Sequence, residues 1–307
     1  MAYGKSIELF LANGTADSLI TAELSNWNGK AIKIPRIEVG SCDREDIKGA
    51  GVYFLFCQNS EDKDDVYIGE SENVHERLCQ HIRDFNADKE PYEWNTAVIF
   101  IGRDLNKALI RYLEHQLVCT ARNVNRYNVL TKNSYSKTVM KESQVAAMDE
   151  FIDNIKILIN ALGYKVLEPL TNIQTKSDGS DADNILYLNV GSVEARGLIT
   201  SEGFVLLAGS DVKNKASEKS ISKSVMSLRN KCFESGIIKD LKTVEDIIIS
   251  SSSYAAQFVL GNSVSGPKIW KNKDGLTLRE LEEKEAENQP QMKDTLDKEQ
   301  GSHTDLL

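Results

Sequence analysis

The hydrophobic and polar positions of the first half of the chain alternate between two periods. Residues 51–57 and 65–69 are short runs rich in Val, Ile, Tyr and Phe, separated by a polar loop, and they predict a β-hairpin. Residues 71–85 predict a helix with Ser71 as its N-cap and an apolar stripe made of Val74, Leu78, Ile82 and Phe85. A strand pair therefore leads directly into an amphipathic helix.

Further elements surround this hairpin and helix. Residues 1–40 contain short strand-like pieces separated by Gly and Asn turns. Residues 96–102, "TAVIFIG", form a continuous apolar run that predicts a buried strand. Residues 104–122 and 141–163 are amphipathic and predict two long helices, the first opened by Asp104. Mixed strands and helices in this order predict an α+β fold.

The composition changes after residue 163. Residues 164–183 are rich in Pro, Gly, Ser and Asp and show no apolar period, which is typical of a linker. New strand and helix patterns follow, and the last residues again lack any period. The sequence thus predicts an N-terminal extension (1–47), a first domain (48–163), the linker (164–183), a small α+β accessory domain (184–281) and a disordered acidic tail (282–307).

Charge and cysteine content limit the function classes. The 307 residues carry a net charge of −9, and the segment 282–307 contributes eight Asp or Glu against three Lys. A protein that only coats a nucleic-acid backbone would be more basic, although a local basic face can still bind DNA. Five scattered cysteines without a CxxC pair argue against a disulfide framework and a Cys-based zinc site. With no membrane-length apolar run and no export signal, we expect a cytoplasmic protein without membrane contact.

Four residues are candidates for a catalytic site: Tyr53, Tyr67, Arg77 and Glu114. A period of two places both tyrosines opposite the Val and Ile positions of their strands, so they share one face of the hairpin. Arg77 lies one turn before His81 on the same helix face. The tyrosines can line a polar groove with this arginine, or they can be ordinary core aromatics of two strands.

Glu114 stands among apolar neighbours in its predicted helix. Leu113 and Leu117 flank it, and Ile110 and Val118 lie one turn away. A carboxylate in such surroundings is costly to bury unless a cation or a metal ion meets it. The alternative is a partly exposed glutamate that pairs with Arg111.

In this order the motifs resemble the GIY-YIG nuclease family. The resemblance rests on "GVY" at 51–53, "YIG" at 67–69, "ENVHERLCQHIRDF" and "RYLEHQLV", and it covers roughly residues 48–135. Val52 stands where the family has Ile. One tyrosine triplet alone would be a weak signal, but the four parts in sequence are specific.

The resemblance implies a set of roles for phosphodiester hydrolysis. Glu114 would be the only protein ligand of one Mg²⁺ or Mn²⁺ ion, because such a hard cation keeps most of its waters. Arg77 would contact the scissile phosphate with its planar fork. Tyr53 would deprotonate or position the attacking water, and Tyr67 would hydrogen-bond the site and orient that water.

The resemblance also implies two further participants. His81 would assist proton transfer, with a solvated helix histidine as the alternative. An asparagine after the Glu114 helix belongs to the family pattern, and Asn128 fits it better than Asn133 because it follows a tyrosine. Gly69 is expected to allow a sharp turn from strand into helix.

The function that the resemblance implies is metal-dependent endonucleolytic cleavage of DNA, in restriction, genome defence or repair. A homodimer on DNA is expected if both strands are to be cut. The alternative is a DNA-binding or regulatory protein with an idle nuclease site.

Residues 185–281 resemble a small domain of unknown function that often follows GIY-YIG modules, similar to domains associated with restriction enzymes and adenine methylases. The resemblance implies contact with DNA or a modified base. This region carries a basic segment that can meet phosphates or can be a solvated helix face, made of Lys213, Lys215, Lys219, Lys223, Arg229 and Lys231. Trp270 can stack on a base or belong to the core.

Overall fold

The computed structural model describes residues 3–58, 63–132, 140–170, 184–217 and 220–287. The chain divides into two compact units, Met1–Pro169 and Leu170–Leu307. Both mix helices with sheets, so the predicted α+β class is confirmed. No helix in the described ranges is both long enough and apolar enough to cross a bilayer.

The first unit is built on one seven-stranded sheet with the order β1-β2-β3-β6-β4-β5-β7. Its neighbouring strands are antiparallel, except that β5 and β7 are parallel. The strands are β1 (Ile7–Leu11), β2 (Ile20–Leu24), β3 (Gly29–Pro35), β4 (Gly51–Cys57), β5 (Asp65–Ser71), β6 (Thr96–Gly102) and β7 (Asn128–Val129). The strand-like pieces of the N-terminal segment therefore belong to the same sheet as the hairpin.

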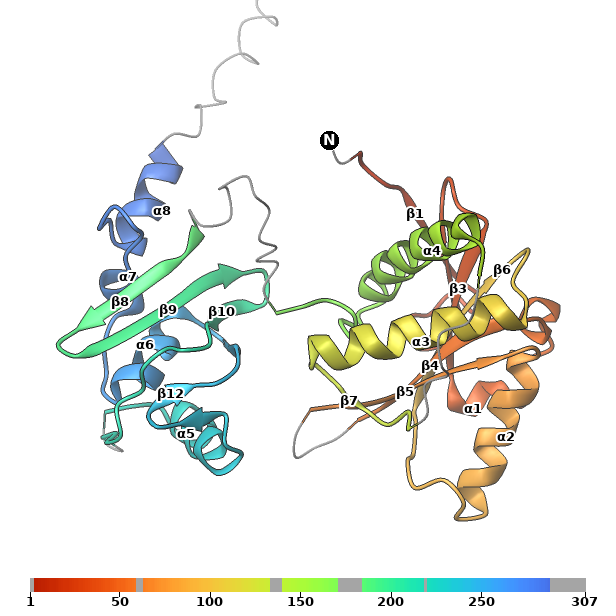
Figure 1. Cartoon of the computed structure of the whole chain (residues 1–307), viewed down its shortest axis with the longest axis horizontal. Helices are drawn as coiled ribbons and strands as arrows, with labels where there is room; N and C mark the ends of the chain where they lie inside the picture. Colours follow the sequence, from red (N-terminus) through yellow and green to blue (C-terminus); the bar gives the residue numbers. More distant parts are fainter. Residues whose placement is uncertain (1–2, 59–62, 133–139, 171–183, 218–219, 288–307) are drawn as a thin grey trace, which may run out of the picture. The chain divides into compact units, whose positions relative to one another are not determined.

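Helices cover both faces of this sheet, so it separates two cores. Figure 1 shows α3 (Lys107–Val124) and α4 (Glu142–Ala161) lying together across one face. There they pack against Val52, Phe54, Val66 and Ile68. The second core contains Tyr53, Leu55, Ile99 and residues of α1 (Arg36–Val39), the 3-10 turn η1 (Glu45–Lys48) and α2 (Val74–Asn86). The face opposite the Val and Ile positions is therefore packed rather than open.

Helix starts differ from the sequence prediction by two or three residues. Ser71 is the last residue of β5, and the N-cap of α2 is Asn73, whose side chain accepts a hydrogen bond from the amide of Glu76. Asn106, rather than Asp104, caps α3 by accepting from two backbone amides. Several polar residues can serve as caps, and the sequence does not show which of them has extended backbone before the first turn.

The predicted linker begins with residues that pack. Val166 and Leu167 are buried in the core beneath α3 and α4, and the ring of Tyr164 stacks on Phe56 at 3.9 Å. The first unit therefore continues past the end of α4. Residues 171–183 of the predicted linker lie outside the described residues.

The second unit contains a four-stranded antiparallel sheet of order β13-β10-β9-β8 and a small two-stranded sheet. Its elements are β8 (Leu186–Val190), β9 (Val193–Thr200), β10 (Gly203–Leu206), α5 (Lys223–Glu234), β11 (Ile238–Lys239), β12 (Lys242–Thr243), β13 (Ile247–Ile249), α6 (Ser252–Leu260), α7 (Gly266–Ile269) and α8 (Leu278–Glu287). One hydrophobic core joins the larger sheet to α5 and α6.

Two side chains considered for nucleic-acid contact are buried in this second core. Trp270 is fully buried, and its indole N–H donates to the carbonyl of Ser252 at 2.9 Å. Arg229 is 2% exposed and donates to the backbone carbonyls of Phe258 and Lys213. Both therefore hold the fold together and do not reach solvent. Lys219 lies outside the described residues.

The first residues of the predicted tail are helical. Residues up to Glu287 belong to α8, where Arg279 and Glu283 form an exposed ion pair one turn apart. The remaining residues of the predicted tail, 288–307, lie outside the described residues.

Candidate functional site

The hairpin of β4 and β5 brings the two tyrosines together. Their strands pair with Tyr53 opposite Gly69 and Leu55 opposite Tyr67. Since side chains alternate along a strand, both tyrosines lie on the face away from Val52 and Ile68. Their rings are nearly parallel with centroids 6.3 Å apart, and Tyr92 stacks against Tyr67 at 5.5 Å. The shared face predicted from the period of two is confirmed.

Gly69 does not form the expected turn from strand into helix, because it lies within β5. A glycine is needed there because of its neighbours. A Cβ atom at this position would stand 2.5 Å from the hydroxyl oxygen of Tyr53 and 2.8 Å from the ring of Tyr67. Any side chain would therefore displace the Tyr53 hydroxyl. The glycine of "YIG" makes room for the tyrosine of "GVY" on the neighbouring strand.

A buried chain of hydrogen bonds begins at the Tyr53 hydroxyl. The phenol oxygen lies 2.9 Å from Nε2 of His81, and Nδ1 of the same imidazole lies 2.7 Å from Oε2 of Glu90. His81 is fully buried, so the alternative of a solvated helix histidine is wrong. Burial lowers the pKa of His81, against the opposing effect of Glu90. The Tyr53 hydroxyl is thus linked through the neutral imidazole of His81 to the carboxylate of Glu90.

Arg77 lies beside this chain. Its guanidinium is 4.0 Å from the Glu90 carboxylate, and it influences the hydroxyls of both Tyr53 and Tyr67. Burial lowers the pKa of Arg77, but the two tyrosines outweigh this effect and leave the pKa raised. The arginine is therefore a permanent, partly exposed cation at the edge of the tyrosine pair.

Glu114 is buried on α3 and is 5% exposed. Its Oε2 atom is buried and has no hydrogen-bond partner among the described residues. Burial, and next the charge of Glu70, raise the pKa of Glu114 from 4.5 to about 7. Its negative charge also raises the pKa of Tyr67, after the larger effect of burial. A buried carboxylate oxygen without a partner is rare in a folded protein and indicates a missing cation or proton.

Glu70 supplies a second buried carboxylate next to Glu114. Its side chain is 4% exposed, and Lys107 donates to it at 2.9 Å. Arg111 lies 3.8 Å from the same carboxylate, and its charge also acts on Glu114. Two cations thus lie against Glu70. The same two cations lower the pKa of Glu114, but burial and Glu70 outweigh them and leave it raised.

The structure does not bring Asn128 to this group. It lies in β7, exposed to solvent, and its amide donates to the carboxylate of Asp65 at 2.8 Å. Asp65 and Glu70 lie at opposite ends of β5, about 17 Å apart at the usual rise per residue. Asn133, the other predicted asparagine, lies outside the described residues.

Glu90, Tyr92 and Glu70 are the site residues that the sequence pattern did not single out. Glu90 and Tyr92 belong to the irregular segment between α2 and β6, which has no hydrophobic period to place its side chains. Glu70 follows "YIG" directly, and its burial depends on the two cations of α3. Only a search for charged residues next to each motif would have flagged it.

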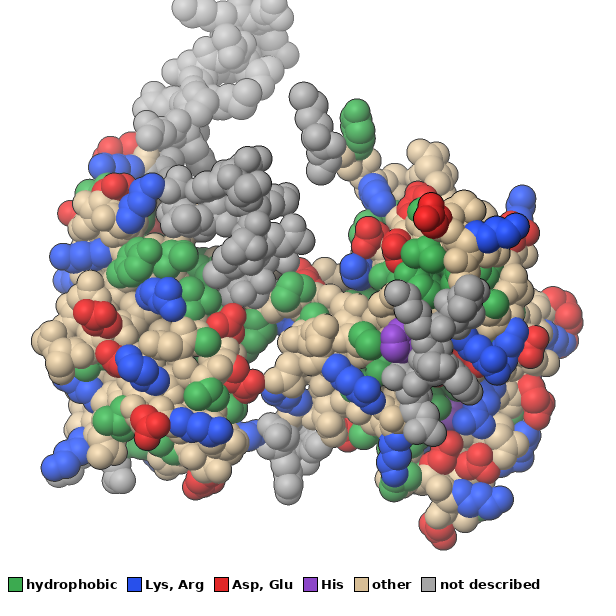
Figure 2. Space-filling view, in the orientation of Figure 1, with side chains coloured by type: hydrophobic (Ala, Val, Ile, Leu, Met, Phe, Trp, Pro, Cys, Tyr) green, Lys and Arg blue, Asp and Glu red, His purple; other side chains and the backbone are tan. Residues whose placement is uncertain are grey.

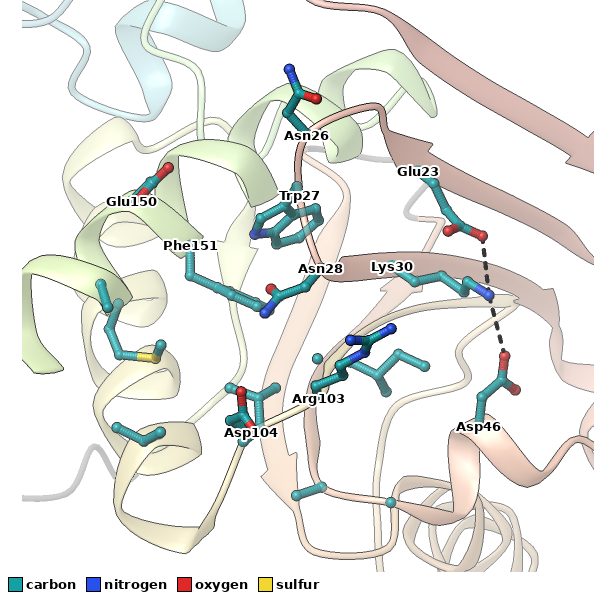
Figure 3. Close-up of a pocket in the computed structure, with 18 of the residues that line it drawn as sticks. Glu23, Asn26, Trp27, Asn28, Lys30, Asp46, Arg103, Asp104, Glu150 and Phe151 are labelled. Atoms are coloured by element: carbon teal, nitrogen blue, oxygen red, sulfur yellow. Dashed lines mark ion pairs between the residues drawn. The ribbon is translucent and has the colours of Figure 1, made fainter.

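A separate cavity of about 1140 Å³ opens against the other core (Figure 3). Trp27 and Phe151 form its aromatic wall, and Lys30 bridges Glu23 and Asp46 at 3.0 Å and 3.8 Å. Acidic residues outnumber basic ones in its lining, which disfavours a phosphate ligand. None of the predicted site residues lines this cavity.

Comparison with known proteins identifies part of the second unit. Residues 186–282 match the family described as a domain of unknown function, DUF4357. The predicted accessory domain, 184–281, coincides with this match to within two residues. No curated protein and no solved structure matches the chain. The matched residues leave the first unit outside, so its resemblance to GIY-YIG nucleases stays a prediction.

The residues around Glu114 fit a hard divalent cation held by few protein ligands. The unpartnered Oε2 atom can bind a cation, and no group of three or more His, Cys, Asp or Glu in the described ranges forms a closed metal site. Mg²⁺ commonly binds through one or two carboxylates and keeps several waters, to be replaced in part by substrate phosphate oxygens. This donor set does not suit zinc, which takes three or four protein ligands.

Proposed function

We propose that this chain is a metal-dependent DNA endonuclease and that its first unit hydrolyses the phosphodiester bond. The observation that carries the proposal is the buried Oε2 atom of Glu114 without a hydrogen-bond partner, on a residue whose charge acts on Tyr67, which Arg77 also influences. Perturbed titratable groups gathered in this way are more common at catalytic sites than in structural cores. The choice of DNA as substrate rests on the resemblance to GIY-YIG nucleases.

In this proposal Glu114 holds one Mg²⁺ or Mn²⁺ ion. When bound, the ion polarises the phosphate and makes water more acidic. Arg77 binds the non-bridging oxygens of the scissile phosphate and stabilises the charge that develops on them. A water oxygen bonds to phosphorus while the bond to the leaving oxygen breaks, and a water proton passes to the surroundings as the leaving oxygen takes one up.

Two observations limit how DNA would be bound. The sequence is acidic overall, and Figure 2 shows Lys and Arg side chains interspersed with Asp and Glu over the visible face. An extended single-sign basic stripe is not part of this view. We therefore expect binding to be local and specific to a DNA feature rather than driven by backbone charge alone. Enzymes of restriction, genome defence and repair all recognise DNA in this way. We further propose that the protein acts in the cytoplasm and forms a homodimer on its DNA target.

The test is nicking of supercoiled plasmid by the full chain with Mg²⁺ or Mn²⁺, alongside Glu114→Gln. The proposal expects nicking by the wild type, loss of nicking on chelation, and loss in the variant. Branched and base-modified DNA extend the substrate set. If the wild type binds these DNAs and cleaves none of them, the alternative of a DNA-binding protein with an idle site replaces the proposal.

A further inference from the structure

The two tyrosines differ in how much of each reaches solvent. Tyr53 is 1% exposed, and its hydroxyl lies against the backbone of Gly69. Tyr67 is only partly buried. A water molecule that attacks a bound phosphate can therefore meet the Tyr67 hydroxyl without rearrangement, whereas the Tyr53 hydroxyl is enclosed.

The hydroxyl proton of Tyr53 is already engaged in a hydrogen bond to His81. An ionised carboxylate only accepts hydrogen bonds, so Nδ1 of His81 must carry the hydrogen that points to Glu90, at 2.7 Å. In a neutral imidazole Nε2 is then an acceptor, and the Tyr53 hydroxyl donates to it at 2.9 Å. This tautomer is assigned from the hydrogen-bond network.

The order of donors and acceptors from Tyr53 to Glu90 determines which atoms are presented to Arg77. Because the Tyr53 hydroxyl donates to His81, its lone pairs are available to accept from the Arg77 guanidinium. Glu90 lies 4.0 Å from the same guanidinium. Charged and polar groups therefore hold the arginine on two sides, in the manner of residues that orient a functional side chain.

The hydroxyl of Tyr67, unlike that of Tyr53, belongs to a partly exposed side chain. The centroid of the Tyr67 ring lies 5.1 Å from that of His81, which follows Arg77 by one turn of α2, and the charges of Arg77 and Glu114 both act on its hydroxyl. The proposed phosphate-binding cation and the proposed metal ligand therefore both influence this partly exposed hydroxyl.

We propose that Tyr67 is the tyrosine that contacts the attacking water, while Glu90, His81 and Tyr53 form a positioning chain that orients Arg77. This reverses the roles that the family resemblance implies for the two tyrosines. The inference rests on the proposed nuclease function for the task of Tyr67, but the positioning chain has a test of its own.

The kinetic test uses single-turnover nicking by the full chain at saturating DNA. Tyr67→Phe removes the hydroxyl next to the water and is expected to slow cleavage about 100-fold with DNA affinity unchanged. Tyr53→Phe is expected to slow it about tenfold. In an Arg77→Lys background, Tyr53→Phe should add less than twofold, because it acts only through the guanidinium, while Tyr67→Phe should still slow cleavage about tenfold or more, because its hydroxyl also contacts the water. A larger loss from Tyr53→Phe than from Tyr67→Phe overturns the assignment.

The second readout needs no activity. Nitrogen-15 NMR of the imidazoles, with His81 identified from a His81→Gln variant, should show the Nδ1-protonated tautomer in the wild type. Glu90→Ala, which removes the acceptor, should abolish this preference, and Glu90→Gln, whose amide oxygen can still accept from Nδ1–H, should keep it in part. If His81 is protonated on Nε2 in the wild type, the positioning chain is refuted. If the wild type cuts no DNA, the nuclease function and the task of Tyr67 both fail, and the tautomer result decides the positioning chain separately.

Discussion

Each unit of this protein buries one charged side chain on a helix, and the two are treated differently. Arg229 in the second unit is 2% exposed and donates to two backbone carbonyls, of Phe258 and Lys213. Glu114 in the first unit is 5% exposed, and one of its oxygens has no hydrogen-bond partner among the described residues. Burial is nearly the same, so the number of partners distinguishes them.

The contrast separates a structural charge from one that awaits a ligand. Burial lowers the pKa of Arg229, yet its partners are built into the fold, so the charge closes gaps in the backbone hydrogen bonding of α6 and the loop before α5. Burial and the charge of Glu70 destabilise the ionised Glu114, and the charges of Lys107 and Arg111 offset this only in part, so its pKa stays raised. A protein retains such a group when a substrate, metal ion or proton completes it.

The largest expected effect is the loss of cleavage on removing the charge of Glu114. Glu114→Gln should slow Mg²⁺-dependent nicking about 1000-fold or more, because the amide cannot replace the carboxylate as a ligand. Glu142→Gln makes the same charge change at an exposed position of α4 and should leave nicking within about twofold. Nicking by Glu114→Gln at the wild-type rate would end the comparison.

Arg229 should show its effect in stability instead. Arg229→Ala leaves two carbonyls unpaired and a cavity in the second core, which we expect to cost about 3 kcal/mol or more of unfolding free energy. Lys223→Ala on the same helix is exposed and should change stability by less than about 0.5 kcal/mol. Urea unfolding followed by circular dichroism measures both. Equal stability of the two variants would show that Arg229 is not structural.

The stability of the first unit should depend on the ionisation of Glu114. Its pKa rises from 4.5 in the unfolded chain to about 7 in the folded one. The folded state thus binds the proton more tightly, and the stabilisation, fully present below the lower value, is lost as pH rises through the higher one. In the presence of a chelator, the wild type should lose about 3 kcal/mol of unfolding free energy over this range relative to Glu114→Gln. Parallel pH profiles of the two proteins would contradict this expectation.

Mg²⁺ gives the matched measurement at pH 8. It should raise the melting temperature of the wild type, since it binds the folded carboxylate, and should leave Glu114→Gln unchanged. An equal shift in both proteins would place the ion elsewhere.

The smallest expected effect concerns Asn128, whose amide is already satisfied by Asp65 at the far end of β5. Asn128→Ala should leave the nicking rate within about twofold of the wild type, because the side chain does not reach Glu114 or Arg77. A loss of tenfold or more would mean that the substrate complex rearranges β7 toward the site.

Much of the first unit could be predicted from the sequence alone. The period of two placed both tyrosines on one face of the hairpin, and the apolar run at Thr96–Gly102 gave β6 with its observed ends. The helical period placed Arg77 and His81 on one face of α2. These patterns depend only on local backbone geometry and on which side chains avoid water.

Only the tertiary structure decided which of these residues have partners. Glu90 lies in an irregular loop, so no sequence period could place its carboxylate on His81. The sequence predicted Gly69 as a turn residue, whereas pairing of β4 with β5 places the Tyr53 hydroxyl against it. The sequence left the roles of Arg229 and Glu114 open. Contacts distant in sequence give Arg229 two carbonyl partners and leave Oε2 of Glu114 without a hydrogen-bond partner among the described residues. Local sequence fixes the direction of a side chain, but burial and pairing are properties of the packed neighbours, which long-range folding brings together.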